Sequence, residues 1–151
     1  MKDYLISDYM NPLFQNAFKI YFAELGINVK DWDGLFAEIN ADEGTYTYLR
    51  MTDDEKTVIG FIMFKPDKMI NWFFEETIGF VREFWIAKNQ RGSGHGSDLL
   101  KKAEEFFSER GIYKIILTTD TAEEFYKSKG YRRDVAYQAK NEDAVFVKNL
   151  K

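Results

Sequence analysis

The sequence predicts a single α/β domain built on a mixed, strand-rich sheet. Its 151 residues are enough for one domain to bury a substantial core without disulfides or a structural metal. The main observation is a strand, a glycine-rich loop, a helix and a second strand in succession over residues 79–118, which form one βαβ unit. Strand-like segments separated by short polar turns lie before and after it, which indicates antiparallel hairpins beside the parallel pair.

The N-terminal segment is predicted to contain a short strand and two amphipathic helices. Residues 1–9 form the strand, and Pro12 then fits the first position of a helix whose apolar residues keep helical spacing until Gly26. A second, shorter helix starts near Trp32 and ends at the polar cluster 40–44. The side chains expected to cap the two helices are Asn11 for the first and either Asp31 or Asp33 for the second.

The middle of the chain predicts a hairpin followed by a segment without a clear period. Residues 45–51 and 57–65 alternate as strands around a polar turn at 52–55. The connection 66–77 is too apolar for a solvated loop, and its structure stays open. Aromatic side chains in and after it are expected in the core rather than in a substrate channel: Trp72, Phe73, Phe74, Phe80 and Phe84.

The βαβ unit consists of a strand at 79–87, a helix at about 94–109 and a buried strand at 114–118 that is apolar on both faces. The C-terminal elements are a helix that opens with a capping box at Thr121–Glu124 and ends at Gly130, and a hairpin of residues 135–140 and 144–148.

Composition excludes several classes of function. The chain has no cysteine and one histidine, which removes disulfides, thiol nucleophiles and cysteine zinc sites. We expect no metal. The net charge of −4 does not favour binding to nucleic acid or anionic membranes. The sequence contains neither a signal-peptide core nor an apolar run long enough to span a bilayer, so it predicts a soluble, cytoplasmic protein.

The glycine-rich loop carries the strongest functional signal. Glycines at alternate positions let successive backbone N–H groups turn toward one point, and the start of the following helix adds its unsatisfied donors and positive dipole end. This arrangement predicts a pyrophosphate site and hence a phosphorylated cofactor. The residues of this loop are Arg91, Gly92, Ser93, Gly94, His95, Gly96 and Ser97.

Two motifs together resemble a known family. Residues 91–96 resemble the R/Q-x-x-G-x-G/A signature of the GNAT superfamily of acyl-CoA-dependent N-acyltransferases, and residues 122–131 resemble its A-x-x-F-Y-x-x-x-G-F/Y helix. The resemblance implies a mixed, mostly antiparallel sheet of about six to seven strands with about four helices. It also implies that two parallel strands, here 79–87 and 114–118, splay apart to admit the pantetheine arm of acetyl-CoA.

The resemblance further implies roles for individual residues. The backbone of Phe84 and Ile86 would hold pantetheine, and the N–H groups from Arg91 to Ser97 would hold pyrophosphate. Tyr126 matches the family tyrosine that protonates the departing thiolate. A phenol in a dry pocket can act as such a general acid. The expected reaction is direct attack of an amine, because the chain offers no cysteine for a covalent acyl intermediate.

The general base is not evident from the sequence. Strict alternation places Phe80, Arg82 and Phe84 on the face where family members carry a base, and Glu83 on the opposite face, toward a helix. The remaining candidates are a water chain or a carboxylate of the preceding connection, which offers Glu75 and Glu76. If Arg82 faces the acceptor, it favours an acceptor that carries a carboxylate or phosphate.

Two other functions fit parts of the sequence. A dinucleotide-binding oxidoreductase would also use a glycine loop, but the spacing here is G-x-G-x-G rather than G-x-G-x-x-G, and little chain follows residue 120. A non-catalytic acyl-CoA sensor fits the missing base, whereas Tyr126 favours catalysis. The acceptor, a small-molecule or peptide amine, stays open, and a homodimer is only the habit of the family.

Overall fold

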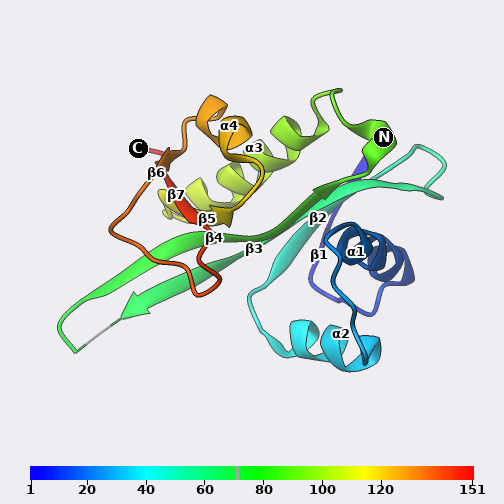
Figure 1. Ribbon diagram of the computed structural model, residues 1–151, viewed down its shortest axis with the longest axis horizontal. Helices are drawn as coiled ribbons and strands as arrows, with labels where there is room; N and C mark the ends of the chain where they lie inside the picture. The colour runs from blue at the N-terminus through cyan, green and yellow to red at the C-terminus, as the bar shows by residue number, and fades with distance from the viewer. Residues whose placement is uncertain (71) are drawn as a thin grey trace.

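The computed structural model describes residues 1–70 and 72–151, and Asn71 lies outside the described residues. The described residues form one seven-stranded sheet in the order β1-β2-β3-β4-β5-β7-β6 (Figure 1). Only the β4–β5 neighbours are parallel, which confirms the predicted mixed, mostly antiparallel sheet. The strands are β1 (Lys2–Ile6), β2 (Tyr46–Met51), β3 (Val58–Ile70), β4 (Glu75–Ile86), β5 (Lys114–Thr119), β6 (Arg132–Arg133) and β7 (Ala144–Asn149). The helices are α1 (Pro12–Glu24), α2 (Trp32–Ala41), α3 (His95–Ser108) and α4 (Glu123–Ser128), with a 3-10 turn η1 (Lys88–Gln90).

Helices α1 and α2 cover one face of the sheet, and α3 and α4 cover the other (Figure 1). The predicted cap of α1 is confirmed, because Asn11 Oδ1 accepts from the backbone N–H of Leu13 at 2.9 Å. Of the two candidates for α2, Asp31 is the cap, and its Oδ1 accepts from Gly34 N at 2.9 Å. No helix within the described ranges is long and apolar enough to cross a membrane.

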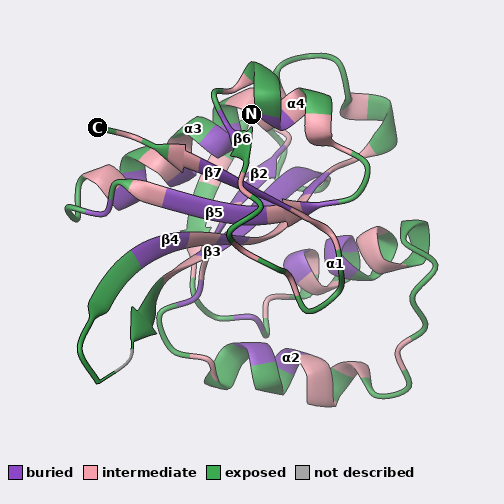
Figure 2. Cartoon of the chain, turned by 60° about the vertical axis from the view of Figure 1, so that its left-hand side comes forward, coloured by how far each residue is buried: buried purple, intermediate pink, exposed green. Residues whose placement is uncertain are grey.

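Each face of the sheet carries its own aromatic-rich core, and the central strands are buried from both sides (Figure 2). On the α1/α2 face, Phe14 of α1 packs edge-on against Phe61 of β3, with ring centroids 5.4 Å apart. On the α3/α4 face, Phe107 of α3 packs against Phe64 of β3 at 5.3 Å. Much of the unusual aromatic content of the chain therefore serves packing.

Strands β4 and β5 part soon after they meet. Among the described residues their ladder holds two pairs, Gly79 with Ile115 and Phe80 with Ile116, although both strands run on to Ile86 and Thr119. The predicted splay of the parallel pair is confirmed. Beyond Phe80, the side of β4 that faced β5 has no strand partner, so its backbone groups are available to a ligand.

A β-bulge interrupts β4 at Arg82. Met63 pairs with Glu83 while the next residue of β3, Phe64, pairs with Val81, so Arg82 is the extra residue. The predicted alternation is therefore wrong here. Phe84 packs into the α3/α4 core, whereas Arg82 and Glu83 both make contacts on the α1/α2 face.

The connection at 66–77 is largely strand, because β3 continues to Ile70 and β4 begins at Glu75. The two strands form a hairpin that projects beyond the rest of the sheet (Figure 1). We call its described residues 66–70 and 72–78 the arm. The expectation that its aromatic residues are core is wrong, since Trp72 is 98% exposed.

The C-terminal region differs from prediction in two places. Helix α4 has Ala122 at its N-cap and no capping box; instead, Thr119 Oγ1 accepts from the backbone N–H of Ala122 at 3.0 Å. The strand expected at 135–140 is absent from the described residues, and β7 pairs with the two-residue β6. The intervening loop packs Tyr137 and Ala139 onto an apolar patch of the sheet, so burial of these side chains replaces strand pairing.

Candidate cofactor and catalytic site

The loop between β4 and α3 has the backbone geometry predicted for an anion cradle. Gly92 and Gly94 have positive φ angles of 83° and 86°, a conformation that costs other residues about 1–2 kcal/mol. Gly94 is also the N-cap of α3, so its left-handed conformation sets how the chain enters the helix. The glycines at these two positions are therefore required by the backbone.

The start of α3 presents unpaired donors. The first N–H of the helix with an intrahelical partner is that of Asp98, which donates to Gly94 O at 3.1 Å, and no side chain among the described residues caps the helix. The N–H groups of His95, Gly96 and Ser97 are left for solvent or an anion. Gly96 also lies against Phe84, whose ring would be 3.7 Å from an added Cβ, so the helix start borders the free side of β4.

The structure gives Arg91 a different role from its neighbours in the loop. Its Nε donates to Ile86 O at 2.8 Å and its Nη2 donates to Glu24 Oε2 at 3.0 Å. Its own backbone N–H donates to Lys88 O at 3.4 Å. Arg91 therefore ties the loop to the end of β4 and to α1, rather than offering its guanidinium to a phosphate.

The side chain of His95, at the start of α3, contacts Arg50 of β2. Its Nδ1 lies 3.0 Å from Arg50 Nη1, and because guanidinium has only donors, Nδ1 must accept. The same Nη1 donates to Asp98 Oδ2 at 3.2 Å, and Arg50 also forms a two-point contact with Asp3 at 2.8 and 2.9 Å. A buried arginine thus links β1 and β2 to the first turn of α3.

Tyr126 lies on α4, 7% exposed, between the rings of Phe125 and Tyr131. Its hydroxyl has no hydrogen-bond partner among the described residues. Because every fully buried side-chain oxygen there has a partner, this hydroxyl must be partly open to solvent. Burial raises the pKa of Tyr126 to about 12. The phenol therefore keeps its proton at neutral pH and can donate it.

The site also contains a carboxylate that the sequence pattern did not identify. Glu83 faces a helix, as predicted, and accepts a hydrogen bond from Tyr21 of α1, with 2.5 Å between the hydroxyl oxygen and Oε2. Burial raises the pKa of Glu83, and the Tyr21 hydrogen bond and the charge of Arg82 oppose that rise. Burial and the neighbouring Glu83 raise the pKa of Tyr21.

Arg82, the chain neighbour of Glu83, and Lys65 both pair with the carboxylate of Asp42. Arg82 Nη1 lies 3.4 Å from Asp42 Oδ2, and Lys65 Nζ lies 2.9 Å from Asp42 Oδ1. Asp42 is the C-cap of α2, and hydrogen bonding to Lys65 holds the pKa of its carboxyl below the usual range. The cluster joins two cations to one carboxylate and retains a net positive charge.

Glu75 and Glu76 lie elsewhere, on the exposed arm. Glu75 pairs with Lys68 across the hairpin at 2.7 Å, and Glu76 pairs with Lys114 at 3.3 Å. Along a strand that rises about 3.3 Å per residue, Glu76 is roughly 20 Å from Glu83. The structure does not bring either carboxylate to the splay.

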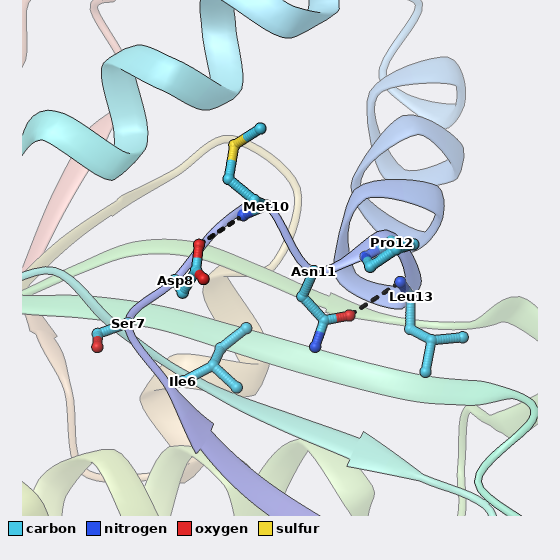
Figure 3. A pocket seen from close by; sticks show the side chains of 7 residues that line it. All are labelled: Ile6, Ser7, Asp8, Met10, Asn11, Pro12 and Leu13. Atoms are coloured by element: carbon cyan, nitrogen blue, oxygen red, sulfur yellow. Dashed lines mark hydrogen bonds between the residues drawn. The ribbon is translucent and has the colours of Figure 1, made fainter.

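A shallow hollow of about 690 Å³ lies at the corner between β1 and α1 (Figure 3). Two of its polar side chains are occupied in local turns: Asp8 Oδ1 accepts from Met10 N, and Asn11 caps α1. It lies at the Ile6 end of β1, whereas Arg50 and α3 meet β1 at Asp3. We therefore take the splay, and not this hollow, as the candidate functional site.

Comparison with known proteins agrees with this geometry. The model of the Acetyltransferase (GNAT) family matches residues 5–131. A GNAT-family acetyltransferase from Staphylococcus aureus Mu50 is similar, with a TM-score of 0.72, 19% identity, and coverage of 99% of this chain and 100% of that chain. A predicted acetyltransferase with acetyl-CoA from Clostridium acetobutylicum has a TM-score of 0.76 and 15% identity, with coverage of 91% of this chain and 94% of that chain. Arabidopsis thaliana NAA60 in complex with a bisubstrate analogue has a TM-score of 0.70 and 13% identity, with coverage of 98% of each chain. No match is found among curated proteins. Because the family model covers most of the chain, this protein belongs to the GNAT family of acetyltransferases.

Proposed function

We propose that this protein is an N-acetyltransferase that moves an acetyl group from acetyl-CoA to a primary amine by direct attack. The observation that carries the proposal is the free side of β4 beyond Phe80, which borders the unpaired N–H groups at the start of α3 and, through the contact of Phe84 with Phe125, adjoins the helix that carries Tyr126. A strand edge, an anion cradle and an acid in one place suit a long thioester with a pyrophosphate.

The residues present fit coenzyme A. The N–H groups of residues 95–97 have no helical partner, and the glycines at 92 and 94 keep the loop free of side-chain bulk. These donors would hold the pyrophosphate, and the backbone of Phe84 and Ile86 would hold pantetheine. When bound, acetyl-CoA supplies an acetyl group already activated as a thioester.

Glu83 and Tyr126 are proposed as the proton-transfer pair. Of the two Glu83 carboxylate oxygens, Oε2 accepts the hydrogen bond from Tyr21, and Oε1 has no hydrogen bond to the described residues. Oε1 is therefore left to take the proton that the attacking amine loses. Tyr126 would give its proton to the sulfur as the carbon–sulfur bond breaks, and backbone N–H groups of β4 would stabilise the oxyanion. Glu83 replaces Glu75 and Glu76 as the proposed base, because only Glu83 lies beside the splay.

The Arg82, Lys65 and Asp42 cluster supports an acceptor with a negative group near its amine. The cluster adjoins Glu83 on the α1/α2 face and has one more cation than anion. An acceptor carboxylate or phosphate would complete its charge balance. Replacing Arg82 with Ala should then raise the KM for the acceptor far more than the KM for acetyl-CoA, and equal changes would contradict this assignment.

The experiment that tests the function has two stages. Thermal midpoints are first measured with acetyl-CoA, CoA, NADH and NADPH, since a ligand that binds only the folded state raises stability by RT ln(1 + [L]/Kd). Thiol release is then followed across amine panels that include anionic amines, with Glu83→Gln and Tyr126→Phe as matched isosteric variants. We expect a shift with both CoA species and amine-dependent release that both variants lower.

The outcomes separate the alternatives. A CoA shift without release from any amine class would identify an acyl-CoA sensor. A nicotinamide shift, or no shift at all, would contradict acetyl-CoA as the donor. Release that is unchanged by Glu83→Gln would remove Glu83 as the base while leaving the acyl transfer itself intact.

A further inference from the structure

The last residue of α1 contacts both β4 and the glycine loop. Glu24 Oε2 accepts hydrogen bonds from Trp85 Nε1 and from Arg91 Nη2, each at 3.0 Å. The Glu24 side chain is 22% exposed and that of Arg91 is 49% exposed, so water screens this ion pair only in part. Arg91 Nε donates in turn to Ile86 O at 2.8 Å. The Glu24–Arg91 pair therefore connects α1 to the carbonyl of the last residue of β4.

The carbonyl that Arg91 contacts lies on the free side of β4. Ala87 N donates to Ile59 O at 2.9 Å, so the backbone groups of Ala87 point toward β3. Because backbone groups alternate along an antiparallel ladder, those of Ile86 and Phe84 point away from β3, to the side where β5 no longer pairs. Arg91 therefore takes up the Ile86 carbonyl on this edge and leaves the Ile86 N–H and both backbone groups of Phe84 to a ligand.

This contact sets where a ligand that pairs with β4 has to leave the strand. A pantetheine arm can form hydrogen bonds with Phe84 and with the Ile86 N–H, but the Ile86 carbonyl already has the Arg91 side chain on it. The next backbone donors in that direction are the unpaired N–H groups of residues 95–97 at the start of α3. A ligand would therefore turn at Ile86 from the strand edge to the anion cradle.

The same helix also contacts the proposed base. Tyr21 lies three residues before Glu24, which places the two side chains on one face of α1, and it donates to Glu83 at 2.5 Å. Glu83 and Ile86 are three residues apart on β4, roughly 10 Å along a strand. Helix α1 therefore contacts β4 at both ends of the short segment that would lie along the thioester.

We infer that Glu24 is a positioning residue for acetyl-CoA, which holds Arg91 on the Ile86 carbonyl and so fixes where pantetheine leaves β4 for the anion cradle. The inference rests on the proposed function, because it takes acetyl-CoA as the donor. Charge alone would give Glu24 the opposite effect, since a carboxylate repels an anionic ligand and an Arg91 released from Glu24 is available to attract one. The direction in which Glu24 changes acetyl-CoA affinity therefore separates positioning from simple electrostatics.

Calorimetric titration of the full chain with acetyl-CoA tests the inference. Glu24→Gln keeps the size of the side chain and an acceptor for Trp85 but removes the charge that holds Arg91, and it should weaken acetyl-CoA binding about 10-fold, the equivalent of roughly one hydrogen bond to a charged group. Arg91→Lys keeps the cation but loses the guanidinium fork that contacts Ile86 and Glu24 together, and it should weaken binding by a similar factor. Glu38→Gln is the matched control, because Glu38 is exposed on α2 and this variant removes the same charge without changing affinity.

Urea unfolding of each variant checks that the fold is kept, and amide hydrogen exchange gives a readout that a loss of stability alone would not move. At saturating acetyl-CoA, exchange of the Ile86 N–H should be slowed in wild-type protein and in Glu38→Gln, and slowed less in Glu24→Gln. Binding that is tighter or unchanged in Glu24→Gln, or unchanged in Arg91→Lys, would overturn the inference and leave acetyl-CoA as the donor. Wild-type protein that does not bind acetyl-CoA would contradict the proposed function itself, and the role of Glu24 with it.

Discussion

Replacing Arg50 with Met tests whether β1 and β2 hold the start of α3 in place. The Arg50 side chain is 3% exposed and contacts Asp3, His95 and Asp98 at once. Two of these three partners belong to the first turn of α3, directly after the glycine loop. Methionine keeps much of the volume but removes every donor, so the variant isolates the polar contacts.

The expected loss of stability comes from the carboxylate of Asp3, which loses its Arg50 partner in the variant. Removing one partner of a buried ion pair costs about 3–5 kcal/mol, because the other charge is left without compensation. Asp3 keeps Lys102 at 2.9 Å, which places the expected loss near the lower end, at about 3 kcal/mol. Freeing His95 and Asp98 should also loosen the anion cradle and weaken acetyl-CoA binding about tenfold, the equivalent of roughly one hydrogen bond.

Urea unfolding and calorimetric titration with acetyl-CoA measure the two effects separately. The double variant Arg50→Met/Asp3→Asn removes the stranded charge, so most of the stability should return while acetyl-CoA affinity stays low. Burial raises the pKa of Asp3, but hydrogen bonds from Arg50 and Lys102 lower it overall, below its ordinary value of 3.8. Because a lowered carboxyl pKa gives stability above that value and loses it as pH falls, wild-type protein should lose this contribution below about pH 4 and the double variant should not. Unchanged acetyl-CoA affinity in both variants would refute the positioning role of Arg50.

Other predictions address the loop and the proton-transfer groups. Gly94→Ala should destabilise the protein by about 1–2 kcal/mol and weaken acetyl-CoA binding, since Gly94 has positive φ, whereas Gly96→Ala meets only ordinary contacts and should keep its stability in urea titrations. Tyr21→Phe should shift the acidic limb of kcat/KM to higher pH, because the Tyr21 hydrogen bond lowers the pKa of Glu83 against the rise that burial causes; an unmoved limb would exclude Glu83 as the base. Tyr126→Phe should lower kcat about 10- to 100-fold in thiol-release assays without changing acetyl-CoA affinity, and since the pKa of Tyr126 is about 12, wild-type activity should show no alkaline limb from this group below about pH 11.

The parts of the fold that local chemistry determines were predictable from the sequence. Asn11 and Asp31 cap their helices through side-chain oxygens two or three residues away, and such short-range contacts are visible in any linear pattern. The strand, glycine loop, helix and strand of the βαβ unit follow in the same way. The glycine loop and the start of α3 could therefore be assigned to named residues before their backbone geometry was known.

The parts that depend on strand pairing were not predictable in this way. Nothing in the alternation of β4 marks Arg82 as an extra residue, and without that residue Glu83 would face away from Arg82. Similarly, the arm looked like a core segment because its aromatic residues were judged by type rather than by what covers them. Both errors concern which surface a side chain faces, which depends on partners distant in the sequence.

The geometry of β4 unites the features that the proposed reaction requires. At Gly79 an added Cβ would lie 2.7 Å from both Phe107 and Ile115, so glycine lets α3 press onto the sheet where β4 and β5 still pair. Past that point the strands part, and the bulge then turns Glu83 to the α1 face while Phe84 stays on the α3 face. The free strand edge thus runs past the proposed base, which lies on the α1 face of the same short, packed segment. Their separation is fixed by strand geometry rather than by loop motion, and this is why a single residue inserted into a strand can matter more to the chemistry than the loops around it.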